Sequence, residues 1–194
     1  MNFYALVVFV HVFAAVPLLS ASIVASPAVR AFVRRARTTR EIRAYLAVGH
    51  PLLLLEPLSA LIVLATGIYL ASAASFWSHG WLQMALVLWI VNAVAAGAVV
   101  KPALGRLTAH TSALEDLPVS PDLDAMRWST RWSVGGDLLF ANDVAVLFLM
   151  TVKPGWPAAL MVVAGVNVAV SLARVIGSAR VRSEINRHDF VDIN

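Results

Sequence analysis

Five apolar stretches, each long enough to cross a lipid bilayer, constrain this chain more than any other feature. They cover about residues 3–25, 45–72, 81–104, 136–153 and 156–176. A transmembrane helix needs about 20 apolar residues, so five crossings use most of the 194 residues and leave little for an extramembrane domain. Because lipid offers no partner to backbone polar groups, each stretch is predicted to be an α-helix. We therefore expect an all-α fold, a polytopic transmembrane helical bundle that forms one integral membrane domain over residues 1–194.

Composition excludes several other classes of protein. Hydrophobic residues make up 60% of the chain and charged residues 13%, which is unlike a soluble domain. The absence of cysteine excludes disulfides, thiolate metal sites and iron–sulfur clusters. The sequence contains no glycine-rich phosphate loop, no H-E-x-x-H and no G-x-S-x-G, so the machinery of nucleotide enzymes and common hydrolases is missing. Whether the protein is an enzyme is left open by these observations.

The basic residues predict an orientation in the membrane. With five crossings, every lysine and arginine except Lys153 falls on one side, in short loops and in the carboxyl-terminal tail. The positive-inside rule then places the amino terminus outside and the carboxyl terminus in the cytoplasm of a bacterial inner membrane. Because these cations serve topology, we expect lipid and no nucleic acid as a partner. Trp128, Trp132, Arg127 and Arg131 suit a short interfacial helix, for which ordinary anchoring at the bilayer border is the simplest interpretation.

Polar residues inside the predicted spans are the candidate functional residues. A charge at bilayer depth costs about 2.5 to 3.5 kcal/mol, so such residues are usually paired, neutral or functional. Counting 1.5 Å per residue puts all of them roughly 10 to 16 Å from the nearest span end. These residues are His11, Glu56, Asn92, Asp143 and Asn167. We expect them to face the bundle interior as one buried polar site centred on His11 and Glu56. Asp137 and Arg174 fall at similar depths in two adjacent spans and are predicted to form an ion pair.

Three explanations compete for this layer of polar residues. The first is hydrogen bonding between helices, at about 0.6 kcal/mol for each contact. The second is haem b or another redox cofactor ligated by His11; His50 is not expected to be the second ligand, because it lies roughly 10 Å away in depth. The third is a proton or cation pathway through Glu56, Asp143 and His11. Only scattered methionines accompany these residues, so no dedicated metal site is predicted.

Five short stretches resemble the CopD-like superfamily of small bacterial integral membrane proteins, and in particular its uncharacterised members. They are FVHVFAAV at 9–16, ATGIYL at 65–70, HGWLQMAL at 79–86, VVKPALGRL at 99–107 and VLFLMTVKP at 146–154. The relatives include copper-resistance permeases and the haem-binding HemJ type of protoporphyrinogen oxidase. The resemblance implies a four-helix core with a histidine in the first helix, matched here by His11, and haem or metal handling. The chain departs from the pattern in Ala14, Ala15 and Pro17 and adds a fifth span after Lys153.

Together these observations favour a haem-associated or redox-accessory membrane protein with a buried polar site around His11 and Glu56. One alternative is a proton-coupled or ion transporter. Another is a non-catalytic subunit of a larger membrane complex, which the short loops suit equally well. Besides lipid, the candidate partners are further copies of this chain in a homo-oligomer or other membrane subunits.

Overall fold

The computed structural model describes residues 2–112 and 116–191, without the side chains of residues 49, 50, 52–54 and 178–191. Five of its helical stretches are long and apolar enough to cross a membrane. They run over Phe3–Arg35, Leu55–Ala73, Gly80–Ser112, Pro121–Val152 and Trp156–Gly177. The predicted all-α bundle of five transmembrane helices is therefore confirmed.

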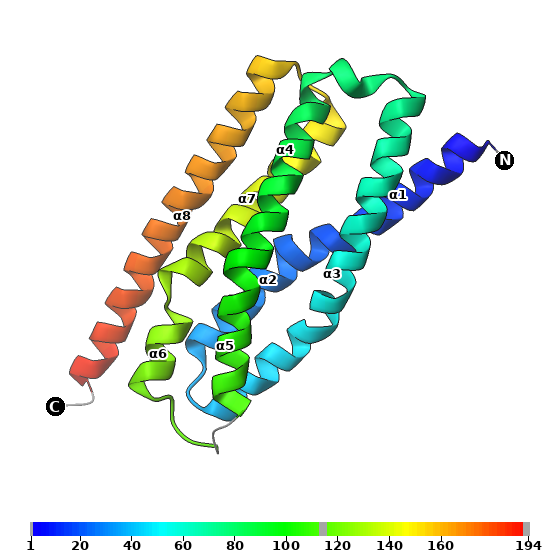
Figure 1. Ribbon diagram of the computed structural model, residues 1–194. Helices are drawn as coiled ribbons and strands as arrows, with labels where there is room; N and C mark the ends of the chain where they lie inside the picture. Colours follow the sequence, from blue (N-terminus) through cyan, green and yellow to red (C-terminus); the bar gives the residue numbers. More distant parts are fainter. Residues whose placement is uncertain (1, 113–115, 192–194) are drawn as a thin grey trace.

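The bundle consists of long helices joined by short connections (Figure 1). In chain order its elements are α1 (Phe3–Leu19), the π-helical η1 (Ser20–Ala25), α2 (Ser26–Arg35), α3 (Thr39–Ala73), the short 3-10 helix η2 (Phe76–Ser78), α4 (Gly80–Ala95), the π-helical η3 (Ala96–Val100), α5 (Lys101–Ser112), α6 (Pro121–Arg127), α7 (Thr130–Val152) and α8 (Trp156–Val191). The helix α1 begins at one end of the bundle and α8 ends at the other, as five crossings require. We call the end that holds α2, α5 and α6 the basic end.

Several helices are longer than the predicted spans. The helix α3 has 35 residues and α8 has 36, which at 1.5 Å per residue is about 50 Å, against about 30 Å of hydrocarbon. The candidate membrane-spanning part of α3 includes Leu55–Ala73, nearly all of which lies within the predicted span 45–72. Counted from Ala73, Glu56 is therefore about 25 Å along the helix. The depth of Glu56 in the bilayer stays a prediction.

Two separate cores hold the helices together. One lies toward the end where α1 begins and joins α4, α7 and α8 through residues that include Trp81, Met84, Leu88, Ala145 and Leu149. The other lies at the basic end, and it includes Val33, Ile42, Leu46, Leu107, Leu123 and Trp132. Exposed apolar side chains such as Phe9 and Phe13 cover the outer surface, as expected of helices that face lipid.

Both π-helical segments precede a proline. Pro27 follows η1 and Pro102 follows η3, each by two residues. A proline ring inside an α-helix clashes with the carbonyl four residues earlier, which here belongs to Ile23 or Ala98. Each of these residues lies within a π-helical segment, where the wider turn relieves the clash without breaking the helix. The π-helical turns therefore allow the first and third membrane-spanning stretches, Phe3–Arg35 and Gly80–Ser112, to continue unbroken to the basic end.

Candidate functional site

A cavity lies between the two π-helical segments, and we refer to it as the inter-helix cavity. Its volume is about 80 Å³, which is room for more than one water molecule. Residues of η1, η3, α2 and α3 form its walls, and they include Ala21, Ala25, Ala96 and Val100. π-helical turns are rare and occur frequently at functional sites, so two of them at one cavity single it out.

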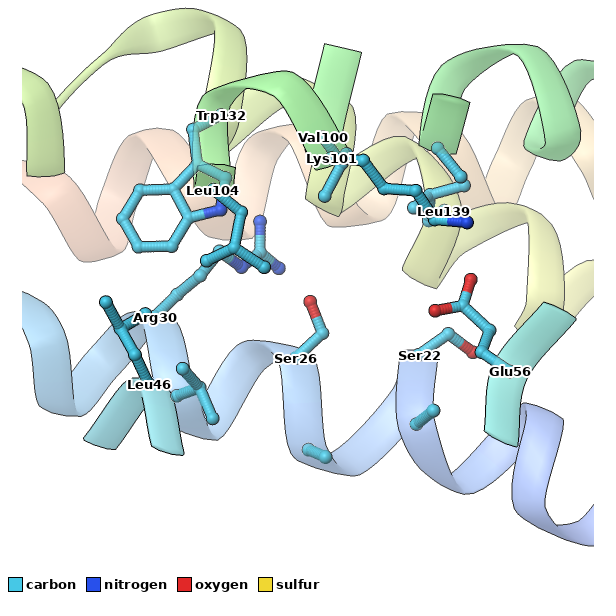
Figure 2. A pocket seen from close by; sticks show the side chains of 14 residues that line it. Ser22, Ser26, Arg30, Leu46, Glu56, Val100, Lys101, Leu104, Trp132 and Leu139 are labelled. Carbon is cyan, nitrogen blue, oxygen red and sulfur yellow. The ribbon is translucent and has the colours of Figure 1, made fainter. Parts of the chain in front are cut away.

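Polar and charged side chains line this cavity along one side and at one end. Ser22 of η1 and Ser26 and Arg30 of α2 all line the cavity. Figure 2 shows the Ser26 hydroxyl pointing into the space between the helices, with the Glu56 carboxylate beside Ser22. Lys101 reaches the same end from the opposite wall. The cavity thus combines an acid, two bases and two hydroxyls with apolar walls.

Glu56 and Lys101 face each other across this cavity without direct contact. They interact electrostatically, yet no ion pair within 4.0 Å joins Glu56 to a cation among the described residues. The Glu56 side chain is half-buried. A gap of this kind between opposite charges suits a bridging water or a small bound ion.

A chain of amide side chains crosses the bundle beside the cavity. Asn167 of α8 donates to Asn142 of α7 at 3.2 Å, Asn142 donates to Asn92 of α4 at 2.8 Å, and Asn92 donates to the Asp143 carboxylate at 2.8 Å. Each amide thus donates in the same direction, and the chain ends on the carboxylate. Hydrogen bonds in such series polarise and strengthen one another.

The cavity and the amide chain meet at Asp143. The Ser22 side chain is within hydrogen-bonding reach of this carboxylate, and Glu56 is close enough to interact with it electrostatically. The structure therefore brings Glu56, Asn92, Asp143 and Asn167 into one connected polar region. The sequence analysis did not identify Asn142, although its position next to Asp143 was a visible signal.

An ion-pair cluster adjoins the cavity at the basic end. Arg30 Nη1 lies 3.0 Å from Asp137 Oδ1 and donates to the Ser133 carbonyl at 3.0 Å. Arg174 Nε lies 3.4 Å from the other Asp137 oxygen, so the Asp137–Arg174 pair expected from the sequence is present in the structure. Arg30 is the additional member, and its close approach needs Gly136, where a Cβ atom would overlap the guanidinium.

His11 lies apart from this region. Its Nδ1 is 2.9 Å from Thr66 Oγ1 of α3, and its ring packs against Gly67. Thr66 is ten residues from Glu56 on the same helix, or about 15 Å. The structure therefore does not bring His11 and Glu56 together as one site. The side chain of His50 lies outside the described residues.

The Thr66 hydroxyl decides which nitrogen of His11 carries the proton. It donates its one proton to the carbonyl of Ile62, at 2.5 Å, or of Val63, at 3.2 Å. With the hydroxyl proton directed to either carbonyl, Nδ1 of His11 is the donor to Thr66 and the lone pair is on Nε2. This is the tautomer in which a histidine binds a metal through Nε2 while its other nitrogen is held by a neighbour.

Trp132 does not anchor the chain at the bilayer border, contrary to the expectation from the sequence. Trp132 is 4% exposed and belongs to the core at the basic end. Arg127 donates to the Ala36 carbonyl at 2.6 Å and to the Val33 carbonyl at 3.3 Å. It therefore satisfies carbonyls at the carboxyl end of α2, a role that only the folded bundle creates.

Five apolar helices around a buried polar region define a polytopic integral membrane protein. The chain belongs to a family described as predicted integral membrane protein (DUF2269), which matches residues 5–154. The matched residues include α1 to α7, and α8 lies beyond them. Neither the curated proteins nor the solved structures contain a match to this chain.

Proposed function

We propose that this protein is a proton-coupled or ion transporter in which Glu56 and Asp143 exchange the transported proton or cation. The observation that carries the proposal is the contact region at Asp143, where the inter-helix cavity meets the amide chain. Two carboxyl groups within electrostatic reach of one another favour sharing a proton or a cation over holding two free charges. Acidic residues inside membrane helices commonly mark such pathways.

The surrounding residues supply the remaining functions of a transport site. Lys101 balances the Glu56 carboxylate when no proton or cation is bound, and it competes with the incoming ion. Ser22 lies beside Glu56 and within reach of Asp143. Its hydroxyl, which donates to the carbonyls of Leu18 and Leu19 at 3.3 and 3.4 Å, can also accept. The amides of Asn92 and Asn142 hold Asp143 in orientation, since an amide does not itself exchange protons at neutral pH.

The proposed orientation follows from the positions of the cations. The basic end carries Arg34, Arg35, Arg37 and Arg40, and by the positive-inside rule it faces the cytoplasm of a bacterial inner membrane. The inter-helix cavity lies on this side of the amide chain. The proton or ion would therefore reach Glu56 first from the cytoplasm and Asp143 second.

Proton flux into vesicles tests this proposal directly. Vesicles that contain the protein and an entrapped pH-sensitive dye receive a pH gradient, with a potassium ionophore to balance charge. The parent should dissipate the gradient faster than protein-free vesicles, and Glu56→Gln and Asp143→Asn should each lose this activity. Asp122→Asn, at an exposed acid on α6, is the matched control and should behave like the parent. For a cation other than a proton, the same variants are compared in uptake of Na⁺ or K⁺.

A different pattern would contradict the proposal. If the parent is no faster than empty vesicles with H⁺, Na⁺ or K⁺, transport of these ions is excluded. If Glu56→Gln and Asp143→Asn transport as fast as the parent, the acids are structural and the pathway lies elsewhere.

A specific observation favours haem association as a second candidate function. The His11 tautomer leaves Nε2 as a free ligand, with Thr66 holding the other nitrogen and Gly67 allowing close approach to the ring. These residues fit single axial ligation of haem b, and the bound haem would supply one-electron redox chemistry. Among the described residues no group of three histidine or acidic side chains is placed to hold a metal ion without such a macrocycle.

The same contact supports a distant relationship to the CopD-like superfamily. The stretch FVHVFAAV contributes His11 and the stretch ATGIYL contributes Thr66 and Gly67, so two of the resembling segments meet in the fold. An absorption spectrum of the purified protein tests the haem candidate. A Soret band that His11→Ala removes would support it, and a haem-loaded preparation whose band survives His11→Ala would contradict ligation at this residue.

A further inference from the structure

The basic end contains a cluster of arginines with too few acids to balance them. Arg30 and Arg174 both contact Asp137, and Arg34 lies within electrostatic reach of all three. Three guanidinium groups around one carboxylate leave this cluster with a net charge of +2. Cations at such density are stable near a membrane only when anions accompany them.

Arg34 is the cation of the cluster with unused hydrogen-bonding capacity, and Oδ2 of Asp137 is the second buried atom in the described part of the cluster without a hydrogen-bond partner. Nη2 of Arg34 donates to the Ser133 hydroxyl at 2.6 Å, and its guanidinium lies 4.9 Å above the Trp128 ring. Its Nε is buried and has no hydrogen-bond partner in the part of the chain that the structure describes. A buried donor left unpaired calls for a water, an ion or a ligand group as its partner.

Arg174 opens the cluster to the surface of the bundle. Its side chain is 36% exposed, and it lines a shallow groove along α8 together with Asn167, Ser171 and Leu172. This arginine lies six residues before Arg180, the first of the charged residues that follow the apolar stretch of the last span. It is therefore at the depth of the lipid headgroups, where tryptophans such as Trp128 also concentrate.

We propose that Arg34 and Arg174 bind a phosphate group at the basic end of the bundle, between α2, α7 and α8. A guanidinium presents two parallel N–H groups that match phosphate oxygens, and basic pockets between membrane helices commonly hold anionic headgroups. A phospholipid headgroup and free inorganic phosphate carry this same group. The depth of Arg174 favours the lipid. The site is separate from Glu56 and does not depend on ion transport.

Thermal unfolding of the purified protein in detergent tests this site. The protein is titrated with phosphatidylglycerol, with phosphatidylcholine as the zwitterionic comparison, and separately with inorganic phosphate against chloride at equal ionic strength. Phosphatidylglycerol should raise Tm in a saturable way. Arg34→Gln and Arg174→Gln should each raise the half-saturating concentration about tenfold or more, the effect of losing one charge-assisted hydrogen bond. Arg35→Gln removes the same charge from a neighbouring position outside the cluster and should leave the titration unchanged.

The lipid titration and the inorganic phosphate titration distinguish the two sources of the phosphate group, and each has a result that would exclude the site. Stabilisation by phosphatidylglycerol alone supports a lipid site, whereas saturable stabilisation by inorganic phosphate that both variants weaken supports a site for free phosphate. If Arg35→Gln weakens binding as much as Arg34→Gln, only general electrostatics is at work and the site is excluded. The absence of any stabilisation beyond phosphatidylcholine and chloride also excludes it. Should Arg34→Gln fail to fold, the partly exposed Arg174 still provides the comparison.

Discussion

Asn92 of α4 donates a hydrogen bond of 2.8 Å to the carboxylate of Asp143 on α7, and through this contact the amide chain ends on an acid. Asn92 also accepts from Asn142 at 2.8 Å. One side chain therefore satisfies two others on the neighbouring helix. Its removal should affect both the stability of the bundle and the orientation of Asp143.

We predict that Asn92→Leu destabilises the protein by about 1 to 3 kcal/mol, because Asp143 and Asn142 each lose a buried partner. Reversible unfolding in mixed detergents measures this free energy. Thr151→Val is the control, since the Thr151 hydroxyl donates only to carbonyls of its own helix, Leu147 at 2.8 Å and Phe148 at 3.0 Å. Equal losses in the two variants would mean that the amide chain contributes nothing specific to stability.

The Asp137 cluster predicts an unusual pattern in double variants. Asp137→Leu strands Arg30, whose side chain is 8% exposed, and should cost about 3 to 5 kcal/mol. Adding Arg174→Leu should not restore stability, because Arg30 stays unpaired. Adding Arg30→Leu instead should recover part of the loss. Unfolding free energies of the three variants check this order, and recovery with Arg174→Leu alone would show that the Arg30 contact is unimportant.

Gly136 should be among the least replaceable glycines of the bundle. A Cβ atom there overlaps the Arg30 guanidinium, so Gly136→Ala must displace Arg30 from Asp137 and lower the melting temperature. Gly165 of α8 has no neighbour within 4 Å of a built Cβ atom. We expect Gly165→Ala to be neutral or to stabilise by up to about 1 kcal/mol, through the higher helix propensity of alanine. A similar melting temperature for both variants would contradict the close approach of Arg30.

The tautomer of His11 is directly measurable. Nitrogen-15 NMR of histidine-labelled protein should show a neutral His11 ring protonated at Nδ1. Thr66→Val removes the acceptor and should abolish this preference, while the resonances of His79, which caps the start of α4, serve as an internal reference. A ring protonated at Nε2 in the parent would reverse the assignment and leave no free ligand nitrogen on the outer side of the ring.

Reporter fusions test the proposed orientation. A reporter at the carboxyl terminus should be active in the cytoplasm, and one at the amino terminus should be active outside. Two reporters on the same side would require an even number of crossings, against the five apolar helices of the structure. The opposite pair of results would reverse the bundle and place the basic end outside.

The architecture of this protein was predictable because it depends on local properties. Length and hydrophobicity decide whether a segment crosses a bilayer, and both are read from neighbouring residues. The five spans and the all-α class follow from these properties alone. The pairing of Asp137 with Arg174 was also expected, since adjacent helices joined by a short turn bring residues of similar depth together. The basic loops are equally plain in the sequence.

The composition of the polar region was decided by the tertiary structure. The π-helical turns rotate every later residue about the helix axis, so Arg30 and Lys101 could not be assigned to a face by counting with a uniform period. His11 of α1 lies opposite Thr66 of α3, ten residues along that helix from Glu56, so the two side chains have different partners. Which polar groups meet depends on helix phase and depth together, and these are fixed only when the helices pack.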